Sequence, residues 1–203
     1  MRELKRALRE IDEGRILRLP DKGTFIAVGD LHGNMKNLER VISIFNKSRY
    51  GIIFLGDYID RGPEQIKVIN TVIRLKLEHP DSVFLLKGNH EYSELKPWPC
   101  DFELEVDKTR LSLYRLIFDR FAFIAYNKRL VFIHGGVPEL KGRYRLKALV
   151  GKRDMEIELL WNDFKPALSS HFAPNYERDP EGRIKYFSQL AVEKFLRDIG
   201  KER

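Results

Sequence analysis

The stretch GDYIDRG at residues 56–62 decides the fold, because it directly follows the short apolar run IIFL at residues 52–55. A short apolar run that ends in Gly-Asp is typical of a buried strand that leads into a loop. Two further apolar runs lead into comparable loops: FIAV at 25–28 into GDLHG at 29–33, and VFLL at 83–86 into GNHE at 88–91. The chain therefore repeats one pattern three times, a strand followed by a loop rich in glycine and polar side chains.

Amphipathic helices are expected between these strands. Apolar residues recur at helical spacing over residues 38–45, and again after Pro63, a residue favoured at the first position of a helix. Strands that alternate with helices predict βαβ units and a parallel sheet. Because ligands of such sheets gather at the carboxyl ends of the strands, we expect these three loops and a fourth, IHGG at residues 133–136, to meet in one crevice.

The second half of the chain changes character. Residues 91–108, which contain two prolines around Trp98, are expected to form a loop, and apolar runs at 122–126 and 130–134 predict a hairpin with antiparallel pairing. The other expected elements are helices within 1–19 and at 110–121, 154–161 and 189–199, and a strand at 184–187. We therefore expect an α/β fold with a second, mixed sheet packed on the first.

The composition is that of a soluble globular protein, since 43% of the 203 residues are hydrophobic and 33% are charged. This length favours one domain spanning residues 1–203. No apolar run approaches the ~18 residues that a membrane helix needs, and the charged start of the chain does not resemble a secretory signal. The one cysteine, Cys100, excludes a disulfide framework within the chain, so we expect a cytoplasmic protein with no membrane partner.

The positive charge is concentrated in one place. The net charge is +7, and residues 141–153 carry six basic residues and no acid. Such a run is either a docking patch for an acidic or nucleic-acid ligand or a solvated face. We favour the solvated face and expect no nucleic-acid partner, because Tyr144 is the one aromatic residue in the run and no nucleic-acid-binding motif accompanies it.

The strand-end loops carry side chains that bind metals. Three of the five histidines, His32, His90 and His134, follow expected strands, beside aspartate and asparagine residues. Carboxylate, imidazole and amide oxygen together suit Mn, Fe or Zn better than Ca. Asp60 lies three residues after Asp57 and can face the same crevice, although an Asp-Arg pair before a helix can also serve only to cap it.

With these motifs the chain resembles the phosphoprotein-phosphatase class, or serine/threonine protein phosphatases, of the calcineurin-like metallophosphoesterases. The family's GDxHG, GDxxDRG and GNHE motifs are all present, and LLWND at residues 159–163 is similar to its LLWxD segment. The resemblance covers residues 24–199 and is looser in the last third. It implies a four-layer α/β/β/α sandwich of two mixed sheets, here lacking its C-terminal strands.

The resemblance also implies a role for each motif residue. The metal ligands would be Asp30 and His32 for a first ion, Asp57 for both ions, and Asn89 and His134 for a second. The catalytic residues would be His90, Asp60 and Arg61, and the substrate phosphate would be bound by Arg61, Asn89 and Arg178. Two ions, Mn in vitro with Fe or Zn as alternatives, would activate a shared hydroxide for in-line attack on phosphorus. His90, kept cationic by Asp60, would then protonate the departing alkoxide.

Two positions depart from the family pattern. The family has a further histidine in an I-R-[GA]-H segment after the helix at 189–199, and this chain reads Gly-Lys-Glu-Arg there. The two remaining histidines, His79 and His171, do not fit that role, so we expect a C-terminally short chain whose second ion has three protein ligands and water. The second phosphate-binding arginine is assigned to Arg178, with Arg183 as the other candidate.

Three functions are compatible with these residues. The first is a metal-dependent phosphomonoesterase, in particular a serine/threonine protein phosphatase acting on a phosphorylated protein or a small phosphoester. The second keeps the site and hydrolyses dinucleoside polyphosphates or other nucleotides. The third is an impaired module that binds phosphate or a partner, and it rests on the missing histidine alone. The sequence carries no signal for oligomeric state.

Overall fold

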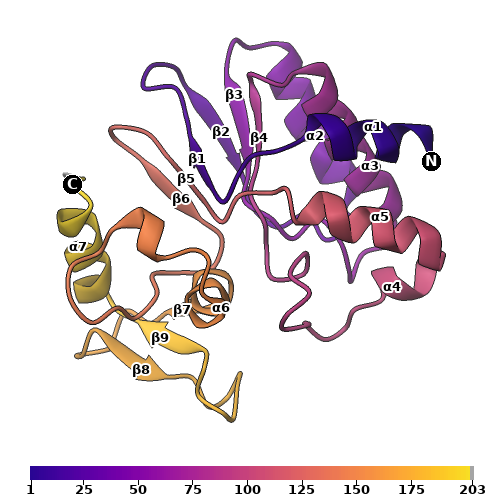
Figure 1. Cartoon of the computed structure of the whole chain (residues 1–203). Coiled ribbons are helices and arrows are strands. Elements are labelled where there is room, and N and C mark those ends of the chain that lie inside the picture. The colour runs from indigo at the N-terminus through magenta and orange to yellow at the C-terminus, as the bar shows by residue number, and fades with distance from the viewer. Residues whose placement is uncertain (202–203) are drawn as a thin grey trace. The chain divides into compact units, whose positions relative to one another are not determined.

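A computed structural model describes residues 1–201 of the chain (Figure 1). The chain forms two units: residues 1–15 together with 22–122, and residues 16–21 together with the chain from Phe123 onward. Each unit has its own hydrogen-bonded sheets, and each is described by itself. The expectation of a single domain stays a prediction.

Three parallel strands form the centre of the first unit. They are β2 (Phe25–Val28), β3 (Gly51–Phe54) and β4 (Val83–Leu85), hydrogen-bonded in the order β2-β3-β4. Ile52 of β3 aligns with Ile26 on one side and with Val83 on the other. All of β4 and most of β3 are buried, as expected for parallel strands covered on both faces. The predicted parallel sheet is thereby confirmed.

Helices α2 (Met35–Asn46) and α3 (Gln65–Glu78) connect these strands, as the apolar spacing predicted. The Asn34 side chain accepts a hydrogen bond from the Asn37 amide at 3.0 Å and so caps α2. The prediction that Pro63 opens this helix is wrong. The helix begins at Gln65 because the backbone of the N-cap residue Glu64 is not helical (φ −120°, ψ 33°) and its amide donates to the Gly33 carbonyl oxygen at 3.2 Å.

Three more helices complete the first unit: α1 (Arg2–Glu10), α4 (Phe102–Glu105) and α5 (Lys108–Phe118). The helix expected within residues 1–19 ends at Glu10, and residues 16–18 instead form strand β1 of the second unit. The expected loop at 91–108 contains the short helix α4. This helix is fixed by Phe102, whose buried ring lies 5.2 Å from that of Tyr114 on α5.

Up to residue 201, the second unit is built of two small sheets and two helices. In one sheet, β1 (Ile16–Arg18) pairs parallel with β5 (Ile124–Tyr126), which pairs antiparallel with β6 (Val131–Ile133) in the predicted hairpin. The other sheet has the order β7-β9-β8 and is also mixed: β7 (Asp163–Phe164), β8 (Phe172–Pro174) and β9 (Lys185–Phe187). The helices are α6 (Arg153–Trp161) and α7 (Gln189–Asp198), and a short 3₁₀ turn covers Leu146–Ala148. The α/β class with mixed sheets is therefore confirmed.

Within residues 1–201, no helix combines the length and the apolar character that crossing a bilayer requires.

The turn between β8 and β9 is organised by Asp179. Its buried carboxylate accepts hydrogen bonds from the Arg183 amide at 2.6 Å and from Arg183 Nη2 at 2.9 Å. These contacts with Arg183 lower the pKa of Asp179 to about 2. The guanidinium of Arg183, the second candidate for phosphate binding, is thus engaged by a structural carboxylate.

We expect the Asp179 contacts to stabilise the fold at neutral pH and to fail in acid. The pKa of Asp179 is about 2 in the folded chain and about 3.9 in an unfolded one. The stabilisation is therefore present above about pH 4 and lost as the pH falls toward about 2. Asp179→Asn should lower the free energy of unfolding by up to about 2 kcal/mol at neutral pH. The loss should be smaller than this limit, because Arg183 is partly exposed and solvent weakens its attraction to Asp179.

Urea unfolding of both chains across this pH range measures the difference. Glu181→Gln is the matched control, because the exposed Glu181 contacts the same guanidinium at 3.2 Å. A difference between wild type and Asp179→Asn that does not shrink in acid would contradict this assignment.

Candidate metal and phosphate site

The three motif loops of the first unit interlock through glycines. A Cβ atom on Gly62 would lie 1.9 Å from the carbonyl oxygen of His32, and one on Gly56 would lie 2.3 Å from the amide nitrogen of Gly88. Gly56 also has a φ of 112°, a conformation that residues with a Cβ rarely adopt. A larger residue at either position would push two loops apart.

Backbone hydrogen bonds join the loops that follow β2 and β3. The amides of Leu31 and His32 both donate to the carbonyl oxygen of Asp57, each at 2.9 Å. The amide of Gly33 donates to the carbonyl oxygen of Tyr58 at 3.0 Å. Because β2 and β3 are neighbours in the sheet, their loops start side by side, and these bonds bring residues 30–33 against residues 57–61.

Four motif residues other than glycine have left-handed backbone conformations. Their φ angles are 40° at His32, 55° at Asp57, 64° at Asp60 and 69° at Arg61. Such a conformation costs on the order of 1–3 kcal/mol per residue and persists only where surrounding contacts hold it. Among the residues that the structure describes, no other residue with a Cβ has a positive φ, and all four belong to the predicted site.

The carboxylate of Glu91 is one of the contacts that hold the loops. Its Oε2 accepts from the amides of Asp57 at 2.8 Å and Gly88 at 3.0 Å, and its Oε1 accepts from the amide of Tyr58 at 2.9 Å. Burial, and then the nearby Asp57 carboxylate, raise the pKa of Glu91 to about 8, and the three amide hydrogen bonds oppose this rise. Glu91 thus anchors the loop after β3 to the loop after β4.

His32, Asp57 and Asp30 form a place where a cation fits. His32 Nδ1 lies 2.8 Å from the carbonyl oxygen of Ile59, a partner that can only accept, so Nδ1 carries a proton and Nε2 presents its lone pair. The buried Nε2 has no hydrogen-bond partner and faces Asp57 Oδ2 at 3.4 Å and Asp30 Oδ2 at 3.9 Å. An imidazole nitrogen and two carboxylate oxygens at these distances can act together as ligands of one cation. The donor set therefore fits a divalent metal ion of the Mn, Fe or Zn type.

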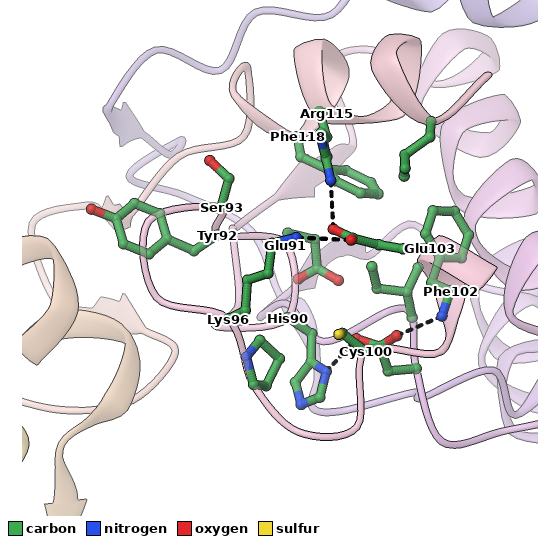
Figure 2. Close-up of a pocket in the computed structure, with 14 residues that line it drawn as sticks. His90, Glu91, Tyr92, Ser93, Lys96, Cys100, Phe102, Glu103, Arg115 and Phe118 are labelled. Carbon is green, nitrogen blue, oxygen red and sulfur yellow. Dashed lines mark hydrogen bonds and ion pairs between the residues drawn. The ribbon is translucent and has the colours of Figure 1, made fainter. Parts of the chain in front are cut away.

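His90 and Asp60 form a buried hydrogen-bonded pair next to this place. His90 Nδ1 lies 2.6 Å from Asp60 Oδ2, and the other oxygen of Asp60 accepts from the Phe102 amide at 2.8 Å (Figure 2). His90 Nε2 lies 3.1 Å from Arg61 Nη2 and 4.0 Å from Asp57 Oδ2. The rings of His32 and His90 meet edge to face at 4.7 Å. One nitrogen of His90 is thus fixed by a carboxylate, and the other faces the arginine and the cation position.

A cavity of about 30 Å³ adjoins the His90–Asp60 pair, with room for about one water molecule (Figure 2). Residues of the 91–103 segment line it, among them Lys96 and Glu103, whose charged groups are 2.8 Å apart. Cys100, the one cysteine of the chain, also lines this cavity.

Of the predicted site residues, the structure thus brings together Asp30, His32, Asp57, Asp60, Arg61 and His90. Asn89 lies beside His90 in the loop after β4 and is buried. His134 follows β6 in the second unit, where the amide of the next residue, Gly135, donates to the Leu159 carbonyl oxygen at 2.9 Å. The roles of Asn89 and His134 stay predictions.

Three other residues named above, one candidate for phosphate binding and the two remaining histidines, make different contacts. Arg178, in the second unit, donates from Nη1 to Asp163 and has its guanidinium 5.1 Å from the centre of the Trp161 ring. Its role in phosphate binding stays a prediction. His79 packs edge to face against Phe45 at 5.2 Å, and the carbonyl oxygen of His171 accepts from the Ser188 amide at 3.0 Å.

Sequence reasoning did not find two residues that support the site. Gln65 accepts from the Asp60 amide at 2.8 Å and donates to Glu105 at 2.7 Å. Asp101 accepts from the Arg61 amide at 3.0 Å. Arg61 and Asp101 are 40 residues apart in the chain, as are Gln65 and Glu105, so no local pattern reveals these two contacts. For Glu91, the GNHE motif gave its position but not its three amide contacts.

The carboxylates, imidazoles and arginine of this site lie at the carboxyl ends of parallel strands, where α/β folds bind their ligands. The model of the calcineurin-like phosphoesterase family matches residues 23–201 of this chain. The chain therefore belongs to that family, as its three motifs indicated.

Its relatives include serine/threonine phosphatases. The chain is 27% identical over 184 residues to the serine/threonine-protein phosphatase PP2A-like PPG1 of Candida albicans, covering 84% of this chain and 43% of that protein. It is 31% identical over 154 residues to the serine/threonine-protein phosphatase PP1-delta of Caenorhabditis elegans, covering 68% of this chain and 49% of that protein. The chain thus spans about half the length of these relatives.

A solved structure shows the same fold. It is a protein serine/threonine phosphatase from Saccharomyces cerevisiae with similarity to human phosphatase PP5, and it matches with a TM-score of 0.73 at 22% identity. The match covers 97% of this chain and 65% of that one. It agrees with the α/β architecture of mixed sheets described above.

We expect Glu91→Ala to destabilise the fold strongly, because it leaves three buried amides without an acceptor. An unsatisfied buried donor costs about 1–3 kcal/mol, so the free energy of unfolding should fall by at least about 3 kcal/mol. Urea unfolding with a chelator present measures this loss without a contribution from bound metal. The exposed Glu78 at the end of α3 supplies the control, Glu78→Ala, which should change stability by less than about 0.5 kcal/mol. Equal stability of Glu91→Ala and wild type would refute the anchoring role.

Proposed function

We propose that this chain is a metal-dependent phosphomonoesterase that removes phosphate from phosphorylated serine or threonine residues of proteins. The observation that carries the proposal is the buried, unpartnered Nε2 of His32 facing two carboxylates, beside the paired His90, Asp60 and Arg61. A cation position beside a His–Asp pair and an arginine suits phosphate hydrolysis, because it can supply positive charge to the phosphate and a proton to the leaving group.

The proposed ligands divide by origin. Asp30, His32 and Asp57 lie together in the first unit, and their donor atoms suit one ion. Asn89 and His134 are proposed for a second ion on the strength of the motif resemblance. When bound, two such ions supply positive charge to the phosphate oxygens and an acidified water as nucleophile.

Arg61 is proposed to bind the substrate phosphate. Its guanidinium is a planar group with several donors, a geometry that matches two phosphate oxygens at once. It is held at 3.1 Å from His90, and it neutralises charge that develops on the phosphate during the reaction. Residue Arg178 is proposed as a second phosphate contact by resemblance alone.

His90 is proposed to protonate the leaving group. The Asp60 carboxylate at Nδ1 fixes the orientation of the ring, so that Nε2 points toward the site. Because a guanidinium can only donate, Arg61 Nη2 must turn from Nε2 to the substrate phosphate before a protonated Nε2 can give its proton to the departing alkoxide oxygen. The general acid is positioned by a buried carboxylate whose second oxygen is itself hydrogen-bonded, so the pair is well preorganised.

The protein substrate is proposed from the relatives, whose names describe serine/threonine-protein phosphatases. The chain spans about half of their length, and family membership alone leaves the substrate open among phosphoesters.

We expect the chain to hydrolyse p-nitrophenyl phosphate only with added metal, and Asp57→Asn to abolish turnover. Asp57 faces both His32 and His90, so losing its charge weakens the cation position. The loss in kcat should be at least ~10³-fold, because metal-ion charge stabilisation is worth several kcal/mol. Release of p-nitrophenol with and without Mn²⁺ measures it, and Asp81→Asn, the same change at an exposed residue, should leave turnover unchanged.

Turnover that survives in Asp57→Asn would refute the metal-dependent mechanism. The substrate is tested in the same assay format by phosphate release from a phosphoserine peptide, a phosphotyrosine peptide and diadenosine tetraphosphate. Preference for the phosphoserine peptide supports the protein-phosphatase proposal, and preference for the dinucleotide contradicts it.

We expect His90→Asn to impair the hydrolysis of poor leaving groups most. Phenyl phosphate releases a more basic oxygen than p-nitrophenyl phosphate and needs a proton more, so its kcat should fall by ~10²–10⁴-fold and that of p-nitrophenyl phosphate by much less. The slope of log kcat against leaving-group pKa measures this, with His79→Asn as the control. An equal loss for both substrates would show that His90 is not the general acid.

A further inference from the structure

Asp60 and Arg61 are two consecutive residues with positive φ, and a distant segment holds both of them. Their φ angles are 64° and 69°. The amide of Gly62 closes the turn on the Asp60 carbonyl oxygen at 2.8 Å, which leaves the amides of Asp60 and Arg61 to other partners. Those partners come from α3 and from the segment that leads into α4.

Asp101 occupies the N-cap position of α4 but does not cap that helix. An aspartate at this position ordinarily accepts from the amide of the second or third helical residue. Here no such bond is made, and Asp101 Oδ1 accepts instead from the Arg61 amide at 3.0 Å. Asp107, the N-cap residue of the next helix, does cap its helix: its side chain accepts from the amides of Thr109 and Arg110 at the start of α5.

The bonds on either side of this contact lead to the same pair of residues. The Phe102 amide, the first of α4, donates to Asp60 Oδ1 at 2.8 Å (Figure 2). Glu105 at the end of α4 accepts from Gln65 Nε2 at 2.7 Å, and Gln65 accepts from the Asp60 amide at 2.8 Å. Both ends of α4 are thus linked to the Asp60–Arg61 turn, Phe102 directly and Glu105 through Gln65, while Asp101 contacts the Arg61 amide.

The Asp101 carboxylate is held in its charged form. Burial opposes the charge, but hydrogen bonds led by the Arg61 amide outweigh it and lower the pKa of Asp101 below its usual value. A charged acceptor makes a stronger hydrogen bond than a neutral one, which suits a contact that must hold a left-handed backbone.

We propose that Asp101 is a positioning residue for Arg61: it holds the Arg61 backbone in the left-handed conformation that directs the guanidinium to His90 and to the substrate phosphate. The inference rests on the proposed function, because it gives Asp101 a role only if Arg61 binds phosphate. Without the Asp101 acceptor, the Arg61 backbone is free to relax to negative φ. The Arg61 side chain then leaves the backbone in another direction, and its guanidinium no longer reaches His90.

The first measurement compares wild type with Asp101→Ala for p-nitrophenyl phosphate turnover and for inhibition by inorganic phosphate, both with Mn²⁺. We expect kcat/KM to fall ~10-fold or more, since small misplacements of positioning groups cost up to ~10²-fold, and the phosphate inhibition constant to rise by a similar factor. Asp101→Asn keeps the acceptor oxygen and should stay within ~3-fold of wild type on both. A loss in Asp101→Asn as large as that in Asp101→Ala would overturn the acceptor role.

A double-mutant cycle separates positioning from general stability. If Asp101 acts through Arg61, then Asp101→Ala costs nothing further in an Arg61→Ala background, because the group that it positions is gone. A purely structural role predicts the same factor in both backgrounds, and that result would overturn the inference. Asp107→Ala is the matched control, because it also removes a carboxylate that accepts from backbone amides, here those of Thr109 and Arg110. It should leave the phosphate inhibition constant unchanged.

Two further outcomes keep the inference distinct from the proposed function. If Asp101→Ala does not fold, Asp101→Ser replaces it, since serine suits the start of a helix but has a side chain too short to keep the Arg61 contact. If the wild type shows no turnover, the proposed function fails, and calorimetric titration of the Mn²⁺-loaded chains with inorganic phosphate decides the inference. Weaker phosphate binding in the Asp101 variant then supports it, whereas equal binding, or none in the wild type, overturns it.

Discussion

Three amide N–H groups from two different loops, those of Asp57, Tyr58 and Gly88, converge on the buried carboxylate of Glu91. This contact joins the carboxyl ends of β3 and β4, and the paired amides of Leu31 and His32 on the Asp57 carbonyl oxygen join β3 to β2. The loops are therefore fixed before any ligand binds. Their glycines allow backbone to pass over backbone at distances that leave no room for a side chain.

Fixed loops explain how the site can hold conformations that would otherwise relax. His32, Asp57, Asp60 and Arg61 all have positive φ, and each is restrained by a hydrogen bond from another loop or helix. These hydrogen bonds bring the carboxylates of Asp30 and Asp57 close to His32 Nε2. They also bring the guanidinium of Arg61 close to His90. The same restraints concentrate negative and positive groups in one small region, which is what a site for a cation and a phosphate requires.

Much of this could be read from the chain itself. The three apolar runs followed by Gly-Asp or Gly-Asn predicted β2, β3 and β4, because a buried strand is a short local pattern, and the helices between them predicted their parallel pairing. The residues of the first unit's cluster, from Asp30 to His90, were all named from the motifs. Other elements were missed for a physical reason: β7 has two residues and β8 ends in a proline, so neither has a pattern of its own, and both exist because β9 lies between them. The early end of α1 at Glu10 follows from the pairing of residues 16–18 with β5, a partner more than a hundred residues away.

The sequence by itself determined which chemical groups the site contains and that they follow the strands of a parallel sheet, because residue type and strand periodicity are local properties. Only the tertiary structure decided how those groups are held. The tautomer of His32 depends on the Ile59 carbonyl oxygen, the orientation of His90 on Asp60, and the backbone of Arg61 on Asp101. Each of these contacts joins residues 27 to 40 positions apart, and such pairs meet only when the sheet and helices bring their loops together.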